Sequence, residues 1–172
     1  MVVLPIRYMG DPVLRGKAAE ITDIDDTLEQ LIGDMIETMY HHHNEGVGLA
    51  APQVGVPLQL IVFDNVEMPY GTDPQVLINP RIIEQEGKSS GSEGCLSVPG
   101  ITALVERAER VKVAGLDRKG DPVEIEAEGF AARLLQHEID HLQGVLFVDR
   151  VGAIKRKMLV SKWNKLRKEH AG

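Results

Sequence analysis

The segment QHEIDHLQG, residues 136–144, contains two histidines four residues apart and a glutamate directly after the first. On a helix, residues four apart lie on one face, so His137 and His141 point the same way. With Glu138 they form the H-E-x-x-H pattern of zinc hydrolases. The pattern also occurs by chance on polar helix faces, but the flanking residues here are apolar. Because burying two imidazoles and a carboxylate without a metal ion would be costly, the segment predicts a metal site.

Two histidines do not complete a catalytic metal site, which normally has three protein ligands and one open position. A histidine three residues after Gly144 would complete one protease pattern, but Phe147 stands there. The only downstream glutamate is Glu169, in a basic C-terminal segment. We therefore expect the third ligand upstream, and Cys95 in SEGCLSVPG, among small residues and turn formers, is the best candidate. The alternative is that Cys95 is an ordinary small buried residue.

A further segment, GVGLAAPQVG at residues 46–55, is interpreted as a turn-rich apolar loop. Gly46 and Gly48 permit the backbone of a ligand to lie close by. Gln53 offers an amide N–H that can stabilise a developing oxyanion. Alone, the segment is equally consistent with an ordinary loop.

The three consecutive histidines at residues 41–43 are not interpreted as a metal site. On a helix they point in different directions, so they cannot jointly bind one metal ion. Partly protonated histidines are favourable at a helix C-terminus because of the helix dipole. We therefore expect a surface helix end.

Hydrophobic periodicity and turn signals predict the secondary structure. The expected helices are residues 25–46, 130–144 and about 153–170, after a short helical turn within 11–18. The expected strands are residues 58–64, 75–86, 110–117 and 121–129. Because helices and strands do not alternate strictly, the fold class is expected to be α+β rather than a doubly wound sheet.

Length and composition suit a soluble globular protein, and we expect residues 1–172 to form a single domain. Cys95 is the only cysteine, which excludes an internal disulfide and suits a reducing compartment. The first residues do not have the pattern of a signal peptide, and no apolar run approaches the roughly 20 residues of a membrane span. We therefore expect a cytoplasmic protein with no membrane partner.

The net charge of −7 conceals an asymmetry. Residues 150–172 carry eight Lys and Arg residues against one acidic residue, Glu169, so this segment is +7 and the remainder of the chain is −14. Such a basic segment indicates an anionic partner. The alternative is a solvated helix whose cations only keep it soluble. No DNA partner is expected.

Three motifs together resemble those of peptide deformylases. They are GVGLAAPQ at residues 46–53, EGCLS at 93–97 and HEIDH at 137–141, and they follow the family's order and approximate spacing. The resemblance extends over nearly the whole chain, including PIRYMGDPVLR at 5–15. It implies an α+β fold with mixed or antiparallel sheets around the helix that bears H-E-x-x-H.

The resemblance also implies a reaction, the removal of the N-formyl group from formyl-methionine at the start of nascent chains, with release of formate. By this resemblance Cys95, His137 and His141 are the metal ligands, Glu138 is the general acid and base, and Gln53 and the Leu96 N–H stabilise the oxyanion. Substrate binding is assigned to Gly46, Val47, Gly48 and Leu134. Glu93 and Arg107 are expected to form an ion pair that orients the Cys95 loop, with an ordinary surface ion pair as the alternative.

The resemblance implies one divalent metal ion. It is Fe²⁺ in the cell, and Zn²⁺, Ni²⁺ or Co²⁺ also suit one thiolate and two imidazoles. It further implies that the basic C-terminal helix docks on the ribosome near the exit tunnel.

Two other functions are compatible with the metal helix alone. One is a small zinc endopeptidase that cleaves internal peptide bonds. The other is a metal-dependent binding module without catalysis, against which the presence of Glu138 and Gln53 argues, since a binder needs neither.

Overall fold

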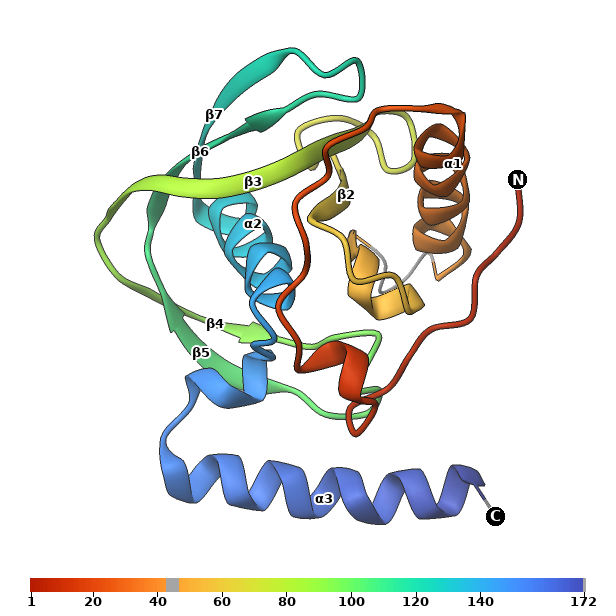
Figure 1. Ribbon diagram of the computed structural model, residues 1–172. Coiled ribbons are helices and arrows are strands. Elements are labelled where there is room, and N and C mark those ends of the chain that lie inside the picture. Colours follow the sequence, from red (N-terminus) through yellow and green to blue (C-terminus); the bar gives the residue numbers. More distant parts are fainter. Residues whose placement is uncertain (43–46, 172) are drawn as a thin grey trace.

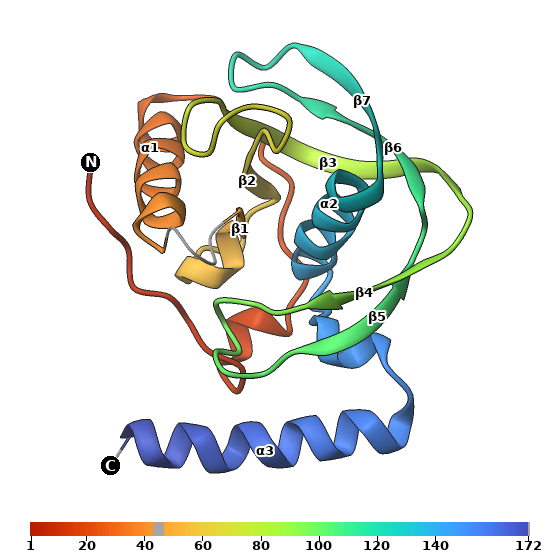
Figure 2. The same cartoon turned by 180° about the vertical axis from the view of Figure 1, so that it is seen from behind.

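The metal-motif helix, α2 (Gly129–Leu142), lies inside a strongly curved antiparallel sheet system (Figures 1 and 2). The computed structural model describes residues 1–42 and 47–171, with side chains described as far as residue 168. The other elements are η1 (Pro12–Leu14), α1 (Asp26–His41), β1 (Gly48–Ala50), η2 (Ala51–Val54), β2 (Leu60–Asp64), β3 (Pro74–Glu86), β4 (Ser89–Glu93), β5 (Ala103–Arg107), β6 (Arg110–Leu116), β7 (Pro122–Glu128), η3 (Phe147–Arg150) and α3 (Ala153–Ala171). None of the described helices is long and apolar enough to cross a membrane.

The strands of the described residues form a five-stranded sheet in the order β1-β2-β3-β6-β7 and a two-stranded sheet, β4-β5. The two sheets are ends of one bent ribbon, because β4 follows β3 and β5 leads into β6. Glu86 pairs with Arg110 at the end of one sheet, and Ser89 pairs with Arg107 at the start of the other. The ribbon bends between these pairs and passes around α2 (Figure 2). All pairings between these strands are antiparallel, which confirms the α+β fold class.

Both faces of the sheet bury apolar side chains. In β2, Leu60 and Val62 pack toward α1, whereas Ile61 and Phe63 pack toward α2. This alternation follows from the period of two in a strand, and it explains why the strand is an unbroken apolar run. The edge strand β7 instead alternates partly buried residues with exposed glutamates.

The C-terminal helix α3 lies along one side of the molecule, beneath β4 and β5 in Figure 1. Trp163 anchors it: the side chain is 3% exposed and its Nε1–H donates to the Met9 carbonyl oxygen at 2.9 Å. Leu159 and Leu166 pack beside it against the same apolar cluster. The remaining described surface of α3 is mostly exposed.

The predicted helices and the four predicted strands are confirmed within a few residues at their ends, except that the helix expected over 25–46 ends at His41 and residues 43–46 lie outside the described residues. The interpretation of residues 46–55 as a loop was wrong for residues 48–54, which form β1 and η2. The hairpin β4-β5 was also not predicted. Of the three consecutive histidines, His41 ends α1 and His42 caps it, as expected for a helix end, whereas residue 43 lies outside the described residues.

The anchoring of α3 can be tested with Trp163→Ala. Removing a buried tryptophan leaves a cavity, so we expect the free energy of unfolding to fall by about 3–5 kcal/mol. Ile154→Ala on the same helix is the matched control, because Ile154 is 82% exposed and its loss should change stability by about 0.5 kcal/mol or less. Urea denaturation measures both variants, and equal midpoints for the two would contradict the anchoring role.

Candidate metal centre

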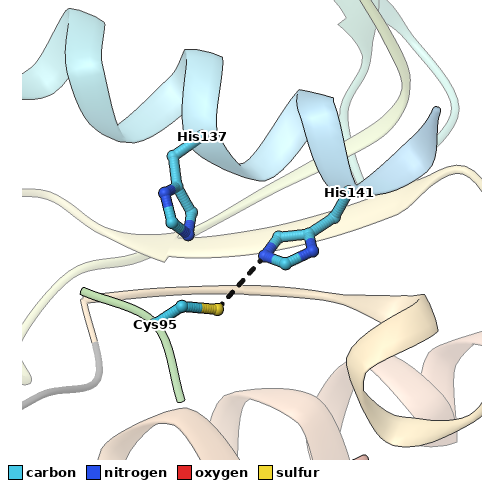
Figure 3. A group of neighbouring side chains, drawn as sticks. All are labelled: Cys95, His137 and His141. Atoms are coloured by element: carbon cyan, nitrogen blue, oxygen red, sulfur yellow. Dashed lines mark hydrogen bonds between the residues drawn. The ribbon is translucent and has the colours of Figure 1, made fainter. Parts of the chain in front are cut away.

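Cys95, His137 and His141 come together as the sequence predicted (Figure 3). One ligand atom from each residue lies within 4.8 Å of the others. The spacing of four on α2 puts both imidazoles on one face, and their ring centroids are 5.1 Å apart. Cys95 enters from the loop after β4, with its Sγ 3.5 Å from the Nε2 of His141.

These residues fit a transition-metal ion. One thiolate and two imidazoles form a donor set that binds Zn²⁺, Fe²⁺, Ni²⁺ or Co²⁺. Burial lowers the pKa of His141 well below its usual range, so its ring is neutral, which is the form that ligates a metal. Two fully buried atoms, Glu138 Oε1 and His141 Nδ1, have no hydrogen-bond partner among the described residues. Buried polar atoms normally have a hydrogen-bond partner, so these two can contact a bound ligand or water.

The ring of His137 is oriented by Glu93. Its Nδ1 lies 2.8 Å from Glu93 Oε1, and because that carboxylate is ionised, Nδ1 carries a hydrogen, which leaves Nε2 as the ring atom that could bind a metal. Burial alone would raise the pKa of Glu93, but hydrogen bonds from Arg107 and His137 outweigh it and lower the pKa to about 2. Arg107 binds both carboxylate oxygens, at 2.7 and 2.8 Å.

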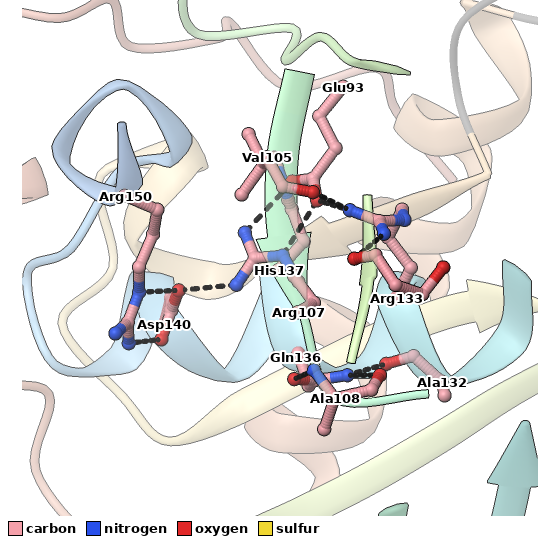
Figure 4. Close-up of polar contacts among 11 residues, drawn as sticks. Glu93, Val105, Arg107, Ala108, Ala132, Arg133, Gln136, His137, Asp140 and Arg150 are labelled. Atoms are coloured by element: carbon pink, nitrogen blue, oxygen red, sulfur yellow. Dashed lines mark hydrogen bonds and ion pairs between the residues drawn. The ribbon is translucent and has the colours of Figure 1, made fainter. Parts of the chain in front are cut away.

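The pair of Glu93 and Arg107 is therefore buried, with both side chains at most 5% exposed, and is not a surface ion pair. Glu93 contacts His137, a candidate metal ligand, directly, and it also precedes the loop that carries Cys95. The same network includes two residues that the sequence analysis missed (Figure 4). Arg133 Nη1 donates to Glu93 Oε2 at 2.7 Å, and Asp140 Oδ2 accepts from Arg107 Nη1 at 2.8 Å. Their positions four before and three after His137 were the available signal.

The amide of Gln53 has a fixed orientation. Its Oε1 accepts the Ala50 N–H at 2.9 Å, so Nε2 faces the opposite way, where it lies 3.2 Å from Ser97 Oγ and 3.4 Å from Cys95 Sγ. Gln53 is thus a buried donor beside the candidate metal ligand Cys95. The Leu96 N–H has no acceptor among the described residues, so it too is available to a ligand.

Glu138 lies against β1. A Cβ added to Gly48 would approach both Glu138 Oε2 and Leu134 Cδ1 to 2.7 Å, so a glycine is needed for this close contact. Glu138 is 4% exposed, and burial raises its pKa to about 7. Because its carboxyl group has no ion-pair partner among the described residues, it can exchange a proton near neutral pH.

A cleft of about 380 Å³ opens onto the site. Its lining includes the expected residues Val47, Gly48 and Leu134, together with Cys95, His137 and Glu138. Gly46, the remaining expected substrate residue, lies outside the described residues. Phe130, which was not predicted, also lines the cleft and is 55% exposed.

Comparisons with known proteins agree on one family. A family model described as "Polypeptide deformylase" matches residues 3–157. The peptide deformylase of Halothermothrix orenii is 56% identical over 92% of this chain and 100% of its own, and that of Thermodesulfovibrio yellowstonii is 49% identical over 95% and 98%. A crystal structure of a peptide deformylase from Legionella pneumophila superposes with a TM-score of 0.91, at 46% identity over 98% of both chains.

The antiparallel α+β fold and the cysteine–histidine cluster define the class of metal-dependent hydrolases. Within that class the chain belongs to the polypeptide deformylase family, whose members are metalloenzymes that remove N-formyl groups. The resemblance seen in the three motifs is thereby confirmed. Neither alternative, a small zinc endopeptidase or a non-catalytic binding module, is favoured.

The role of Glu93 can be tested with Glu93→Gln. A neutral amide is a weaker acceptor for the His137 N–H, and such partners of metal ligands typically contribute about 10- to 100-fold in metal affinity. We expect a loss of that size in competition with a chelator. Glu106→Gln is the matched control, because Glu106 is an exposed residue on the adjacent strand β5, and this variant should retain full affinity. Equal affinities in the two variants would show that Glu93 does not orient a ligand.

Proposed function

We propose that the enzyme removes the formyl group from N-formylmethionine at the start of nascent polypeptides, with Cys95, His137 and His141 as ligands of one divalent metal ion. The observation that carries the proposal is the buried carboxyl group of Glu138 facing the same cleft as the metal cluster. A site with ligands but no proton-transfer group would only bind metal. A site with both can hydrolyse an amide.

When bound, the metal ion supplies Lewis-acid chemistry, which polarises a carbonyl group and lowers the pKa of water. Glu138, which lines the cleft, accepts the proton of the attacking water through its carboxylate. It then delivers this proton to the nitrogen of the departing amine, which becomes the free N-terminus of methionine. A pKa of about 7 for Glu138 suits both transfers.

Gln53 and Leu96 act on the formyl oxygen. As the formyl carbon becomes tetrahedral, its oxygen gains negative charge, and the Gln53 Nε2–H and Leu96 N–H stabilise that charge. The Ala50 N–H holds the Gln53 amide in the required orientation. Since a formyl carbon carries only hydrogen, a tight site here excludes larger acyl groups.

The substrate backbone pairs in a strand-like manner with Val47 and Gly48, which line the cleft at the start of β1. The methionine side chain then lies in the apolar part of the cleft beside Val47 and Leu134. Formate release from a formyl-Met peptide, compared with cleavage of an internal bond in an unformylated peptide, tests this function. Cleavage of the unformylated peptide without formate release would instead establish an endopeptidase.

The proton-transfer role is tested by Glu138→Gln. Because Glu138 is not a metal ligand, the variant should keep its metal content, whereas formate release should fall by about 10² to 10⁴, the usual size of a general acid–base effect. Metal analysis and a formate assay on the same preparation measure both quantities. Normal metal content with near-normal formate release would remove Glu138 from the mechanism.

We assign Fe²⁺ as the metal in the cell, with Zn²⁺, Ni²⁺ or Co²⁺ as replacements after purification. A cysteine thiolate beside a redox-active ion requires a reducing environment, which also supports a cytoplasmic location. Metal analysis of protein purified without oxygen, paired with activity, tests the assignment. Iron content that does not parallel activity would contradict it.

Helix α3 is assigned to ribosome docking near the exit tunnel. Its outer face is basic: a surface hollow there is lined by Lys157, Lys162 and Lys165 together with exposed Ile154 and Met158. Lys168 continues the exposed positive charge. Ribosomal RNA is a polyanion, and a protein that neutralises its phosphates releases counterions, so binding should weaken steeply with salt.

The docking proposal is tested by reversing Lys157, Lys165 and Lys168 to Glu. Ribosome co-sedimentation should fall, while deformylation of a free short peptide persists, because the anchor Trp163 is untouched. The matched control reverses three exposed cations of the body, Lys17, Lys88 and Lys119, and has the same net charge. Equal losses in both triple variants would indicate a general charge effect, and unchanged, salt-insensitive binding would leave α3 as a structural helix.

A further inference from the structure

Arg133 is the one cation among the described residues that line the active-site cleft. Its guanidinium is held rigidly by three hydrogen bonds: Nη1 donates to Glu93 Oε2 and to the Val105 carbonyl oxygen, each at 2.7 Å, and Nη2 donates to the Ser89 carbonyl oxygen at 2.8 Å. A guanidinium has five N–H groups. The other two, on Nε and Nη2, have no acceptor among the described residues.

A glycine makes room for this guanidinium. A Cβ added to Gly91, in β4, would lie 2.9 Å from Arg133 Nε and 3.0 Å from its Cζ. Any other residue at position 91 would therefore displace the charged group. The φ of Gly91 is not positive, so its backbone conformation does not require a glycine. The absence of a side chain instead leaves the space that Arg133 occupies.

The position of Arg133 along α2 matches the length of a methionine side chain. Arg133 precedes the metal-ligand candidate His137 by four residues, and Leu134 precedes Glu138 by four, so each lies one turn, about 5.4 Å, from the reacting group. In formyl-methionine, five covalent bonds separate the formyl carbon from the sulfur, and bonds of about 1.5 Å give a comparable reach. With the formyl group at the metal and the side chain in the cleft, the sulfur lies level with Arg133 and Leu134.

We propose that Arg133 is a specificity-determining residue that donates an N–H to the thioether sulfur of the substrate methionine. The inference rests on the proposed function, since it requires the formyl group to lie at the metal. A thioether is a weak acceptor, so a donor that is charged and held in a fixed position is best able to form a hydrogen bond with it. In norleucine a methylene replaces the sulfur. When norleucine binds, the Arg133 N–H loses its water and gains no acceptor in exchange. A wholly apolar pocket would have the opposite preference, because the methylene is the more apolar group.

The wild-type enzyme provides the first test. We expect kcat/KM for formyl-Met-Ala-Ser to exceed that for formyl-norleucyl-Ala-Ser by about 2- to 12-fold, the range of a net hydrogen bond. Equal values, or a preference for norleucine, would overturn the proposal while leaving deformylation intact. Absence of formate release from both peptides would instead contradict the proposed function.

Variants separate this role from a merely structural one. In Arg133→Leu the methionine preference should disappear or reverse, whereas a structural defect would lower kcat/KM for both peptides equally and leave their ratio unchanged. Gly91→Ala retains the arginine but moves its guanidinium, so the ratio should also fall. Arg118→Leu, which removes an exposed arginine that pairs with Glu29, should retain the wild-type ratio.

Bound metal and thermal unfolding are measured for every variant, so that loss of the fold is recognised. If Arg133→Leu does not fold, Gly91→Ala and the wild-type comparison still decide the question. A wild-type ratio that persists in Gly91→Ala and in any folded Arg133→Leu would overturn the proposal.

Discussion

A single buried carboxylate, Glu93, joins the elements on which the site depends. It lies at the end of β4 and accepts hydrogen bonds from Arg107 on β5 and from Arg133 and His137 on α2. Burying one carboxylate alone would cost several kcal/mol, but four charge-assisted or polar bonds satisfy both of its oxygens. The bent ribbon and the helix inside it are thus fixed to each other at the residue that orients the candidate metal ligand His137. A shift of the ribbon relative to α2 would change the direction of the His137 ring.

The curvature of the sheet is likewise related to the burial of polar side chains, here those of α2. Helix α2 is buried on nearly all sides, yet its described residues include buried arginine, glutamine, glutamate and histidine side chains. Buried polar groups normally have hydrogen-bond partners, and most of these side chains find them in the surrounding ribbon. Gln136 shows how this is met: its Oε1 accepts the Ala108 N–H and its Nε2 donates to the Ala108 carbonyl oxygen, where the ribbon turns from β5 into β6. An open, flat sheet would leave such groups without partners on one side of the helix.

The sequence predicted what local pattern can encode. The spacing of His137 and His141, the absence of a downstream ligand and the small residues around Cys95 led to the metal cluster, and apolar periodicity located three helices and four strands. The β4-β5 hairpin was missed because SSGSE has almost no apolar residue and little strand propensity. The segment SSGSE is nevertheless a strand, because the β4-β5 hairpin continues the ribbon started by β3 and β6. Arg133 and Asp140 were missed because the bonds that join them to the ribbon reach residues 28 to 44 positions away. Only their spacing from His137 along the helix pointed to them.

Among the described residues, helix α3 connects to the candidate active site through its inner face. Trp163 donates to the Met9 carbonyl oxygen, and the Met9 N–H donates to the Ser97 carbonyl oxygen at 2.8 Å. The Ser97 hydroxyl in turn accepts from Gln53 Nε2. This series of bonds joins α3 to the loop that carries Cys95 and Leu96. A change in how the apolar face of α3 packs would therefore shift residues of the candidate site. The outer face has no such connection among the described residues. Substitution of its lysines would therefore leave this series of bonds intact. The two faces of α3 thus differ: the inner face is joined to the loop of the candidate site, whereas the outer face presents exposed lysines.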